Sequence, residues 1–450
     1  MAGPPPHSDI GRSALAKASW RLLPLIGLGY GIAYMDRVNI SFAALRMNAD
    51  LGFSATVYGL GGGLFFLSYA LGEVPSNLML VRFGARRWIA RIMLTWGVLA
   101  AGMMFVSTPT QFYVMRFLLG AAEAGFFPGV VYYLMQWFPA AERGRAISRF
   151  YIALPLSSVV MGMVAGALLN LDGRLGLHGW QWLFLVEGLP AVLLSAAILF
   201  LLPNGPAEAK WLTDEEKGWI ATALAADRAR VGASGDPGVG RALLDPRIWV
   251  LGAANICILG SAYAFTLSAP IILTAATGLG PTYVGFLIAA VALVSAFGMI
   301  LAGWHSDHRR ERYLHTIVFL AFMAAAFLTL GLTSAPLVVV GAYAVTIIAG
   351  NAIQTVFWLI PSDALHGRSA AVGVAAIGSI GMIGSFVGPY LWGLARDHTG
   401  SYQAGLLTLT VTYLTAAALI VVLRRLTRPA VAAVVTEPAP SVLGRGSGAA

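Results

Sequence analysis

Six charged residues stand inside long apolar stretches of the first half of the sequence. Asp36 and Arg37 are adjacent within the apolar run 22–45, and Arg116 and Glu123 lie in a later run. A charged side chain at the centre of a bilayer costs about 2.5–3.5 kcal/mol even on insertion scales. Proteins retain such residues where they face a cavity and bind or move something. The alternative is a buried ion pair that only fixes how the helices pack.

The residue types indicate anion binding and proton transfer. Arginine keeps its proton and binds a carboxylate through a planar fork, so Arg37 and Arg116 are candidate anion receptors. At a rise of about 1.5 Å per residue, both arginines fall roughly 10 Å below the outer surface, and Glu123 lies two turns deeper. Burial disfavours an ionised carboxylate and a nearby arginine favours it. We therefore expect Asp36 and Glu123 to bind and release protons as a cavity opens and closes.

Two further carboxylates, Glu73 and Glu187, complete the set of six. Glu73 precedes Val74-Pro75, and both pairing with a neighbouring helix and coupling to transport stay open for it. Glu187 stands beside Gly188-Leu189-Pro190, and we expect it to be structural.

The second half carries no charge well inside an apolar run and offers neutral polar and aromatic side chains instead. The candidates for substrate contacts are Ser268, Asn351, Gln354, Trp358 and Ser379, with Asn255, Tyr263, Thr266 and Ser385 nearby in the same runs. This division suits an anion held between two bundles and a proton carried by carboxylates in one of them.

The composition predicts an all-α polytopic membrane protein. Of 450 residues, 58% are hydrophobic and 11% are charged, whereas a soluble domain carries about a quarter charged residues. Twelve apolar runs are long enough to cross a bilayer. They divide the chain into a cytoplasmic N-terminal segment (1–19), a six-helix bundle (20–202), a cytoplasmic linker (203–246), a second six-helix bundle (247–425) and a disordered cytoplasmic tail (426–450).

The basic residues predict the orientation in the membrane. With both termini inside, all but five of the 29 lysines and arginines fall in cytoplasmic segments. The exceptions are Arg46, Arg174 and Arg396 in outer loops and Arg37 and Arg116 within spans. This is the positive-inside pattern. It assigns the net charge of +9 to topology in a membrane rather than to nucleic-acid binding.

Two local sequence patterns predict a helix in the linker and a kink in one span. Thr213-Asp214-Glu215-Glu216 has capping-box spacing and opens a helix that we expect on the cytoplasmic face as an amphipathic element, anchored by Trp211 and Trp219. The run 125–129, Gly-Phe-Phe-Pro-Gly, is expected to kink the fourth span.

The sequence offers no site for a metal or cofactor. His305 and His308 lie in a basic loop without a cysteine or carboxylate at ligand spacing. Nucleotide-binding patterns are also absent, which argues against transport driven by ATP. We predict neither a metal nor a cofactor.

Several motifs resemble those of a known family, the anion:cation symporters of the major facilitator superfamily. The resemblance covers roughly residues 20–425, and its first half is most similar to bacterial transporters of tartrate and other hydroxy acids. The motifs are Tyr34-x-Asp36-Arg37-x-Asn39, Glu73-Val74-Pro75-Ser76-Asn77, Arg82-Phe83-Gly84-Ala85-Arg86-Arg87, Arg116-x6-Glu123, and Trp180-Gln181-Trp182-Leu183-Phe184-x-x-Glu187.

The resemblance implies roles for particular residues. Asp36 and Glu123 are the implied proton-coupling carboxylates, Arg37 faces the substrate, and Arg116 partners an acid. Tyr34 and Tyr69 line the cavity. The sequence departs from the family where Val81 replaces an acidic residue before the basic loop, and where 266–270 and 378–382 lack the usual tryptophan and asparagines.

The sequence as a whole predicts a monomeric secondary transporter that takes up a small organic anion with protons by alternating access. A hydroxycarboxylate such as tartrate, or a sugar acid, is the first candidate substrate, and an aromatic carboxylate is the alternative. A membrane sensor that does not transport is a further alternative, although the retained charges argue against it. No constellation of nucleophile and base supports an enzyme.

Overall fold

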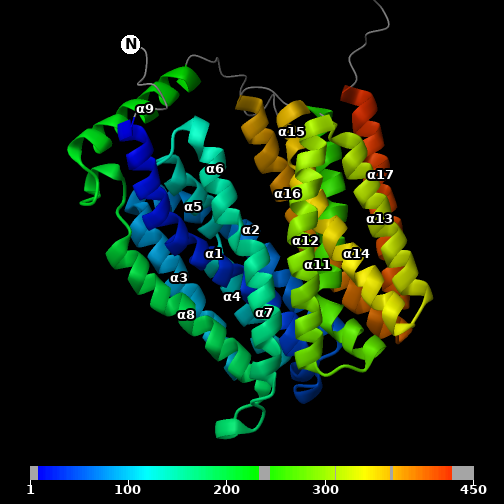
Figure 1. Cartoon of the computed structure of the whole chain (residues 1–450). Coiled ribbons are helices and arrows are strands. Elements are labelled where there is room, and N and C mark those ends of the chain that lie inside the picture. Colours follow the sequence, from blue (N-terminus) through cyan, green and yellow to red (C-terminus); the bar gives the residue numbers. More distant parts are fainter. Residues whose placement is uncertain (1–8, 233–243, 310, 365–367, 428–450) are drawn as a thin grey trace, which may run out of the picture.

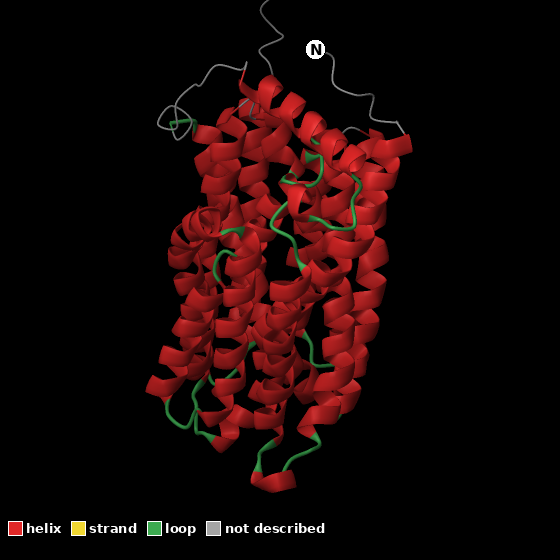
Figure 2. Ribbon diagram, turned by 90° about the vertical axis from the view of Figure 1, so that its left-hand side faces the viewer, coloured by secondary structure: helices red, strands yellow, loops and turns green. Residues whose placement is uncertain are grey.

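The computed structural model describes residues 9–232, 244–309, 311–364 and 368–427. Within these ranges every regular element is a helix, and Figure 2 shows helices joined by short loops. The prediction of an all-α membrane protein is confirmed. The expected tail lies almost wholly outside the described residues, which end at Thr427.

The helices form two groups along the chain (Figure 1). The first group contains α1 (Asp9–Asp50), α2 (Ala55–Phe83), α3 (Ala85–Gly102), α4 (Pro109–Glu123), α5 (Phe126–Met135), α6 (Ala140–Tyr151), α7 (Ala153–Leu169) and α8 (Gly179–Leu201). The second contains α11 (Pro246–Thr277), α12 (Pro281–Arg309), α13 (Tyr313–Leu332), α14 (Pro336–Phe357), α15 (Leu359–Ala364), α16 (Arg368–Thr399) and α17 (Gln403–Thr427). Helix α9 (Asp214–Gly232) lies between them in the chain.

Eleven helical segments in the described part of the chain are long and apolar enough to cross a membrane. Helix α1 is not among them, although it has 42 residues and packs within the first group. Asp36, Arg37 and Asn39 interrupt its apolar run. The eleven segments together with α1 are consistent with the twelve expected spans. The helix begins at Asp9, so part of the predicted N-terminal segment continues the first span.

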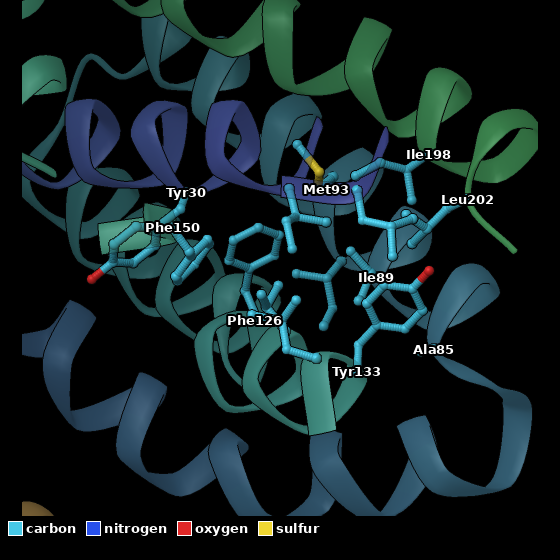
Figure 3. Close-up of a cluster of buried hydrophobic side chains, with 14 of the residues drawn as sticks. Tyr30, Ala85, Ile89, Met93, Phe126, Tyr133, Phe150, Ile198 and Leu202 are labelled. Carbon is cyan, nitrogen blue, oxygen red and sulfur yellow. The ribbon is translucent and has the colours of Figure 1, made fainter. Parts of the chain in front are cut away.

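Each group has its own hydrophobic core. In the first group, side chains from α1, α3, α5, α6 and α8 meet around Met93 and Phe126, which are both fully buried. Figure 3 shows this cluster, with Tyr30 and Phe150 at one end and Tyr133 and Leu202 at the other. The core holds the helices that carry the charged residues in fixed positions relative to one another.

The predicted kink in the fourth span is confirmed as a break between α4 and α5. Gly125 has φ 84°, a left-handed conformation that side chains rarely adopt. A Cβ there would also collide with the side chain of Ser76 on α2. The break makes Glu123 the last residue of α4.

Helix α9 corrects one expectation about the linker. Its capping box is confirmed, with the Thr213 amide donating to Glu216 over 2.9 Å and the Glu216 amide donating to the Thr213 hydroxyl over 3.3 Å. Trp219, however, is buried in the core of the first group, and Trp211 stacks on Trp137 at 5.5 Å between ring centroids. The tryptophans therefore anchor α9 to protein, because the first group offers them an apolar surface.

The two groups meet at the far side, by which we mean the end of the bundle opposite the start of α1 and the end of α17. The Tyr58 hydroxyl of α2 donates to the Leu267 carbonyl of α11 over 2.8 Å. Asn170, which follows α7, donates to Thr282 of α12 over 3.0 Å. Glycines such as Gly162 permit close backbone approach there.

A carboxylate also joins the two groups at the far side. Asp397 near the end of α16 accepts hydrogen bonds from the amides of Ala55, at 3.0 Å, and Thr56, at 2.7 Å. These are unpaired donors of the first turn of α2, where a negative charge is favoured by the helix dipole. Asp397 therefore caps a helix of the other group.

Candidate functional site

Arg37 and Glu123 form an ion pair inside the first group of helices. The Arg37 Nη2 lies 2.6 Å from Glu123 Oε1, and Nε donates to the same oxygen over 2.8 Å. Glu123 is fully buried, whereas 15% of the Arg37 side chain is exposed. The pair thus joins α1 to α4 and leaves its arginine partly accessible.

The position of Glu123 at the end of a helix makes this pairing necessary. The last turn of an α-helix carries partial negative charge, which disfavours a second negative charge there. Burial disfavours the ionised carboxylate further. Arg37 offsets both costs, so an ionised Glu123 depends on its partner.

Arg116 lies two turns before Glu123 on α4 and is also buried. Its Nε donates to the Gly61 carbonyl over 3.4 Å, and its guanidinium lies 4.8 Å from the centre of the Phe65 ring. Nη1 and Nη2 have no hydrogen-bond partner within the described part of the chain. Arg116 interacts electrostatically with Asp36 and Glu123 without a close ion pair to either. Its free donors could bind a carboxylate.

Asp36 is buried next to the two arginines. Its Oδ1 accepts a hydrogen bond of 3.2 Å from Asn39, one turn along α1, whereas Oδ2 has no partner among the described residues. Two arginines and two carboxylates therefore share one region. Their charges balance when both carboxylates are ionised, and each proton added to a carboxylate leaves one positive charge for an anion.

Three tyrosines surround Arg37. Its guanidinium lies 4.8 Å from the centre of the Tyr69 ring. Tyr263 of α11 also interacts with Arg37 and packs on Phe66 at 4.0 Å between ring centroids. Tyr34 is half-buried and interacts with Tyr263. The expected positions of Tyr34 and Tyr69 thus fall close to the arginine.

Tyr263, which the sequence offered only as one of several polar and aromatic side chains of the second half, is brought to Arg37 by the structure. In the sequence it is a polar aromatic residue within an apolar run, and several nearby polar residues share that property. What singles it out is the approach of α11 to α1, which no spacing along the chain reveals.

The candidate contacts of the second half fall in separate places. Ser268 accepts a hydrogen bond of 2.9 Å from Trp392, and Asn351 donates to Ser295 over 2.8 Å, so both are engaged within their own group. Trp358 donates to Gln354 over 3.2 Å. A Cβ on Gly378, next to the exposed Ser379, would lie 3.8 Å from the Trp358 ring. Gln354, Trp358 and Ser379 therefore belong to one region.

The remaining carboxylates differ from each other. Glu73 is half-buried and interacts electrostatically with Arg37. Glu187 is buried, and neither of its oxygens has a hydrogen-bond partner within the described ranges.

A groove of about 520 Å³ lies at the far side, away from these charged residues. Residues of both groups line it, such as Asn48 and Arg396.

Comparison with known proteins identifies the family. Residues 26–389 match the model described as Major Facilitator Superfamily. The chain is 42% identical to a protein of Agrobacterium vitis named "Putative tartrate transporter", over 93% of each chain. It is 45% identical to "Putative metabolite transport protein NicT" of Pseudomonas putida, over 89% of this chain and 92% of that one.

A solved structure agrees in fold. It is that of a bacterial homolog of the human lysosomal transporter Spinster, in an inward-facing and unoccupied conformation. The two structures superpose with a TM-score of 0.75 at 18% identity, covering 91% of this chain and 97% of the other. The arrangement of helices is therefore one that solved membrane transporters also adopt.

Proposed function

The chain belongs to the Major Facilitator Superfamily, and from that premise we propose that it takes up a small organic anion together with protons. Like the other members of its family, it is a polytopic membrane transporter and not an enzyme. We propose, beyond this, that transport is coupled to protons, and we propose a class of substrate and roles for individual residues.

The ion pair of 2.6 Å between Arg37 and Glu123 carries the proposal. A substrate carboxylate that binds the Arg37 fork competes with Glu123 for the same donors. Glu123 then stands unpaired and buried at the negative end of α4, where it is stable only when protonated. Binding of the anion and uptake of a proton are thereby linked.

Asp36 and Arg116 form the second part of the proposed mechanism. The free Nη1 and Nη2 of Arg116 can receive a second carboxylate of the substrate or pair with Asp36. A proton on Asp36 frees Arg116 for the substrate, in the same way that a proton on Glu123 frees Arg37. Asp36 and Glu123 are therefore the proposed proton-coupling residues.

The remaining proposed substrate contacts come from both groups. Tyr34 and Tyr69 stand beside Arg37, and we add Tyr263 for the contacts described above. Gln354, Trp358 and Ser379 provide polar and aromatic surface in the second group. Ser268 and Asn351 can contribute only after they release Trp392 and Ser295.

The two groups are proposed to rock about the substrate. With the terminus side taken as cytoplasmic, as the basic residues favour, the contacts of Tyr58 and Asp397 close the outer side and the described conformation is inward-facing. We further propose a bacterial inner membrane and a monomeric transporter with both termini inside. The contacts between the two groups at the far side, from Tyr58 to Leu267 and from Asn170 to Thr282, support this reading.

A hydroxycarboxylate such as tartrate, or a sugar acid, is the first candidate substrate. The name of the relative from Agrobacterium vitis supports it, and so do two arginines in one region, because a dicarboxylate can engage both. Tyr34, Tyr69 and Tyr263 around Arg37 favour an aromatic carboxylate as the second candidate, since their rings can pack on one of the substrate.

Competition for uptake separates these candidates. The purified protein is reconstituted in proteoliposomes, and uptake of labelled tartrate under an inward proton gradient is measured with unlabelled tartrate, a sugar acid or a hydroxybenzoate. We expect tartrate or the sugar acid to inhibit more strongly, and a protonophore to abolish accumulation. Stronger inhibition by hydroxybenzoate than by unlabelled tartrate or the sugar acid would favour the aromatic acid, and accumulation that resists the protonophore would contradict proton coupling.

A further inference from the structure

A basic and aromatic surface lies where α2 ends and α3 begins, at the end of the bundle opposite the far side. Phe83, the last residue of α2, stacks on Trp88 of α3 with 5.6 Å between ring centroids and 13° between the ring planes. The Arg91 guanidinium lies 3.9 Å from the centre of the Trp88 ring. The Arg82 guanidinium lies 5.6 Å from the centre of the Phe83 ring. Two arginines thus flank one pair of stacked rings.

The backbone and a hydrogen bond fix this ring pair in place. The indole N–H of Trp88 donates to the Ser76 hydroxyl of α2 over 3.0 Å. Gly84, which joins the two helices, has φ 86°, a conformation that side chains rarely adopt. The chain therefore turns sharply after Phe83 and brings the first turn of α3 against the last turn of α2.

The arginines of this surface have no acidic partner among the described residues. Arg86 of the same helix lies 4.0 Å from Glu208. Arg82, Arg87 and Arg91, by contrast, form no ion pair with any described carboxylate. The Nε of Arg91 is buried and has no hydrogen-bond partner within the part of the chain that the structure describes. Because a buried donor on a charged group is costly when unpaired, Arg91 requires an anion from outside these residues.

The same side of α3 continues as apolar surface. Arg87, Arg91, Leu94 and Val98 recur at the spacing that places residues on one side of a helix. Leu94 is 45% exposed and Val98 is 56% exposed, in a segment able to cross the membrane. Such a face contacts lipid tails. Arg91 lies six residues after Ala85, the first residue of α3, or about 9 Å along the axis, and a long arginine side chain reaches the headgroups from there.

We propose that this surface binds the headgroup phosphate of an acidic phospholipid in the cytoplasmic leaflet. Arg87 and Arg91 hold the phosphate through charge-assisted hydrogen bonds, and Arg82 adds a further positive charge. Trp88 packs against the glycerol region, where tryptophan is favoured. The acyl chains lie along the apolar part of the same face. The choice of leaflet rests on the orientation proposed above, and no part of the inference rests on the identity of the substrate.

A phospholipid matches more of this surface than a soluble anion does. Inorganic phosphate would satisfy the arginines, but it would not use the exposed Leu94 and Val98. A phospholipid presents phosphate, glycerol and tails in the order in which α3 presents its arginines, its ring and its apolar side chains. An acidic headgroup is favoured over a zwitterionic one because clustered basic side chains beside a span attract anionic lipid.

Native mass spectrometry of the full-length protein in detergent measures lipid binding without transport. Arg87→Gln and Arg91→Gln should each lower the affinity for phosphatidylglycerol about fivefold. Arg91→Lys keeps the charge and should retain most of the binding. The matched control is Arg145→Gln, which removes the same charge from an exposed arginine that pairs with Glu142 at 3.1 Å. It should bind phosphatidylglycerol as the wild type does.

Three results would overturn the proposal. The first is equal binding by the wild type, R87Q and R91Q, or an equal loss in R145Q. The second is displacement of phosphatidylglycerol by inorganic phosphate at the same concentration, which would assign the surface to a soluble anion. The third is equally tight binding of the zwitterionic phosphatidylcholine. If R91Q fails to fold, R87Q decides, because the Arg87 side chain is exposed. A protein that binds the lipid but moves no organic anion would contradict only the proposed function.

Discussion

Glu123 ends helix α4 with its carboxylate 2.6 Å from the Arg37 guanidinium, although the two residues lie 86 positions apart in the chain. The negative end of the helix, burial and the lack of any hydrogen bond to Oε2 within the described residues all make this carboxylate depend on Arg37. A substrate anion that takes Arg37 therefore changes the protonation of Glu123. This competition is the simplest link between anion and proton in the structure.

Arg37→Lys tests anion recognition. Lysine keeps the charge but loses the planar fork, so we expect substrate affinity to fall at least about tenfold, equivalent to ~1.4 kcal/mol. Affinity is measured by isothermal titration of the purified protein. Arg46→Lys, an exposed residue of the same helix, is the control and should bind normally. Unchanged binding by R37K would move the receptor role to Arg116.

Gly120→Ala tests the contact between α2 and α4. A Cβ there would lie 2.9 Å from the carbonyl carbon of Phe65 and closer still to its oxygen, so the helices that carry the site must separate. We expect a loss of stability of about 1–3 kcal/mol, visible as a lower Tm in detergent. Gly144→Ala, with no atom within 4 Å of its Cβ, should leave Tm unchanged or slightly raised. Equal effects of the two would refute the contact.

Asp397→Ala tests closure of the far side. The substitution leaves the Ala55 and Thr56 amides uncapped, at a cost of about 0.5–2 kcal/mol, and should shift the transporter towards a state open on that side. A cysteine introduced at the buried Ala264, with Cys257 replaced by serine, reports this opening through an impermeant thiol reagent. We expect faster labelling in D397A than in His398→Ala, the exposed neighbour. Equal labelling would mean that Asp397 does not stabilise the closed side.

The ionisation of Glu216 should make the attachment of α9 to α1 depend on pH. Desolvation opposes its ionisation, but hydrogen bonds from Lys17 and Ser13, both at 2.7 Å, outweigh desolvation and lower the pKa from 4.5 to about 2. The contribution of Glu216 to stability is therefore complete above about pH 4.5 and fades as the pH falls towards 2. Glu216→Gln should cost about 1–2 kcal/mol at neutral pH.

The measurement for Glu216 is thermal unfolding in detergent from pH 7 to pH 3. The stability difference between wild type and E216Q should shrink as the pH falls. Asp214→Asn, whose side chain is fully exposed in the first turn of the same helix, should show little difference at any pH. A gap between wild type and E216Q that is constant with pH would contradict the role of the ionised carboxylate.

The sequence predicts well how deep a residue lies in the membrane. It predicts poorly which way that residue's side chain points around the axis of its helix. Apolar run lengths located the helices, and the glycines of 125–129 predicted the break that ends α4 at Glu123. The spacing placed Arg37 and Arg116 at one level and Glu123 two turns deeper, but it could not say which arginine reaches Glu123. That depends on how α1 and α4 rotate against each other, which the packing of many side chains decides.

Contacts between the two halves were the least predictable part of the site. Tyr263 reaches Arg37 because α11 approaches α1, and no local pattern distinguishes it from other polar residues of its run. Trp211 and Trp219 gave the signal of a membrane anchor, but a protein surface satisfies an exposed tryptophan as well as lipid does. Sequence patterns show which groups need a partner and leave the partner unspecified.

Glu123→Gln tests the link between anion and proton most directly. Glutamine cannot ionise and therefore mimics the protonated carboxyl, so the variant should bind substrate and exchange it across the membrane without moving a proton. In proteoliposomes we expect counterflow of labelled substrate to stay measurable while accumulation driven by a proton gradient is lost. Accumulation at the wild-type level by E123Q would contradict the proposal that Glu123 carries the transported proton.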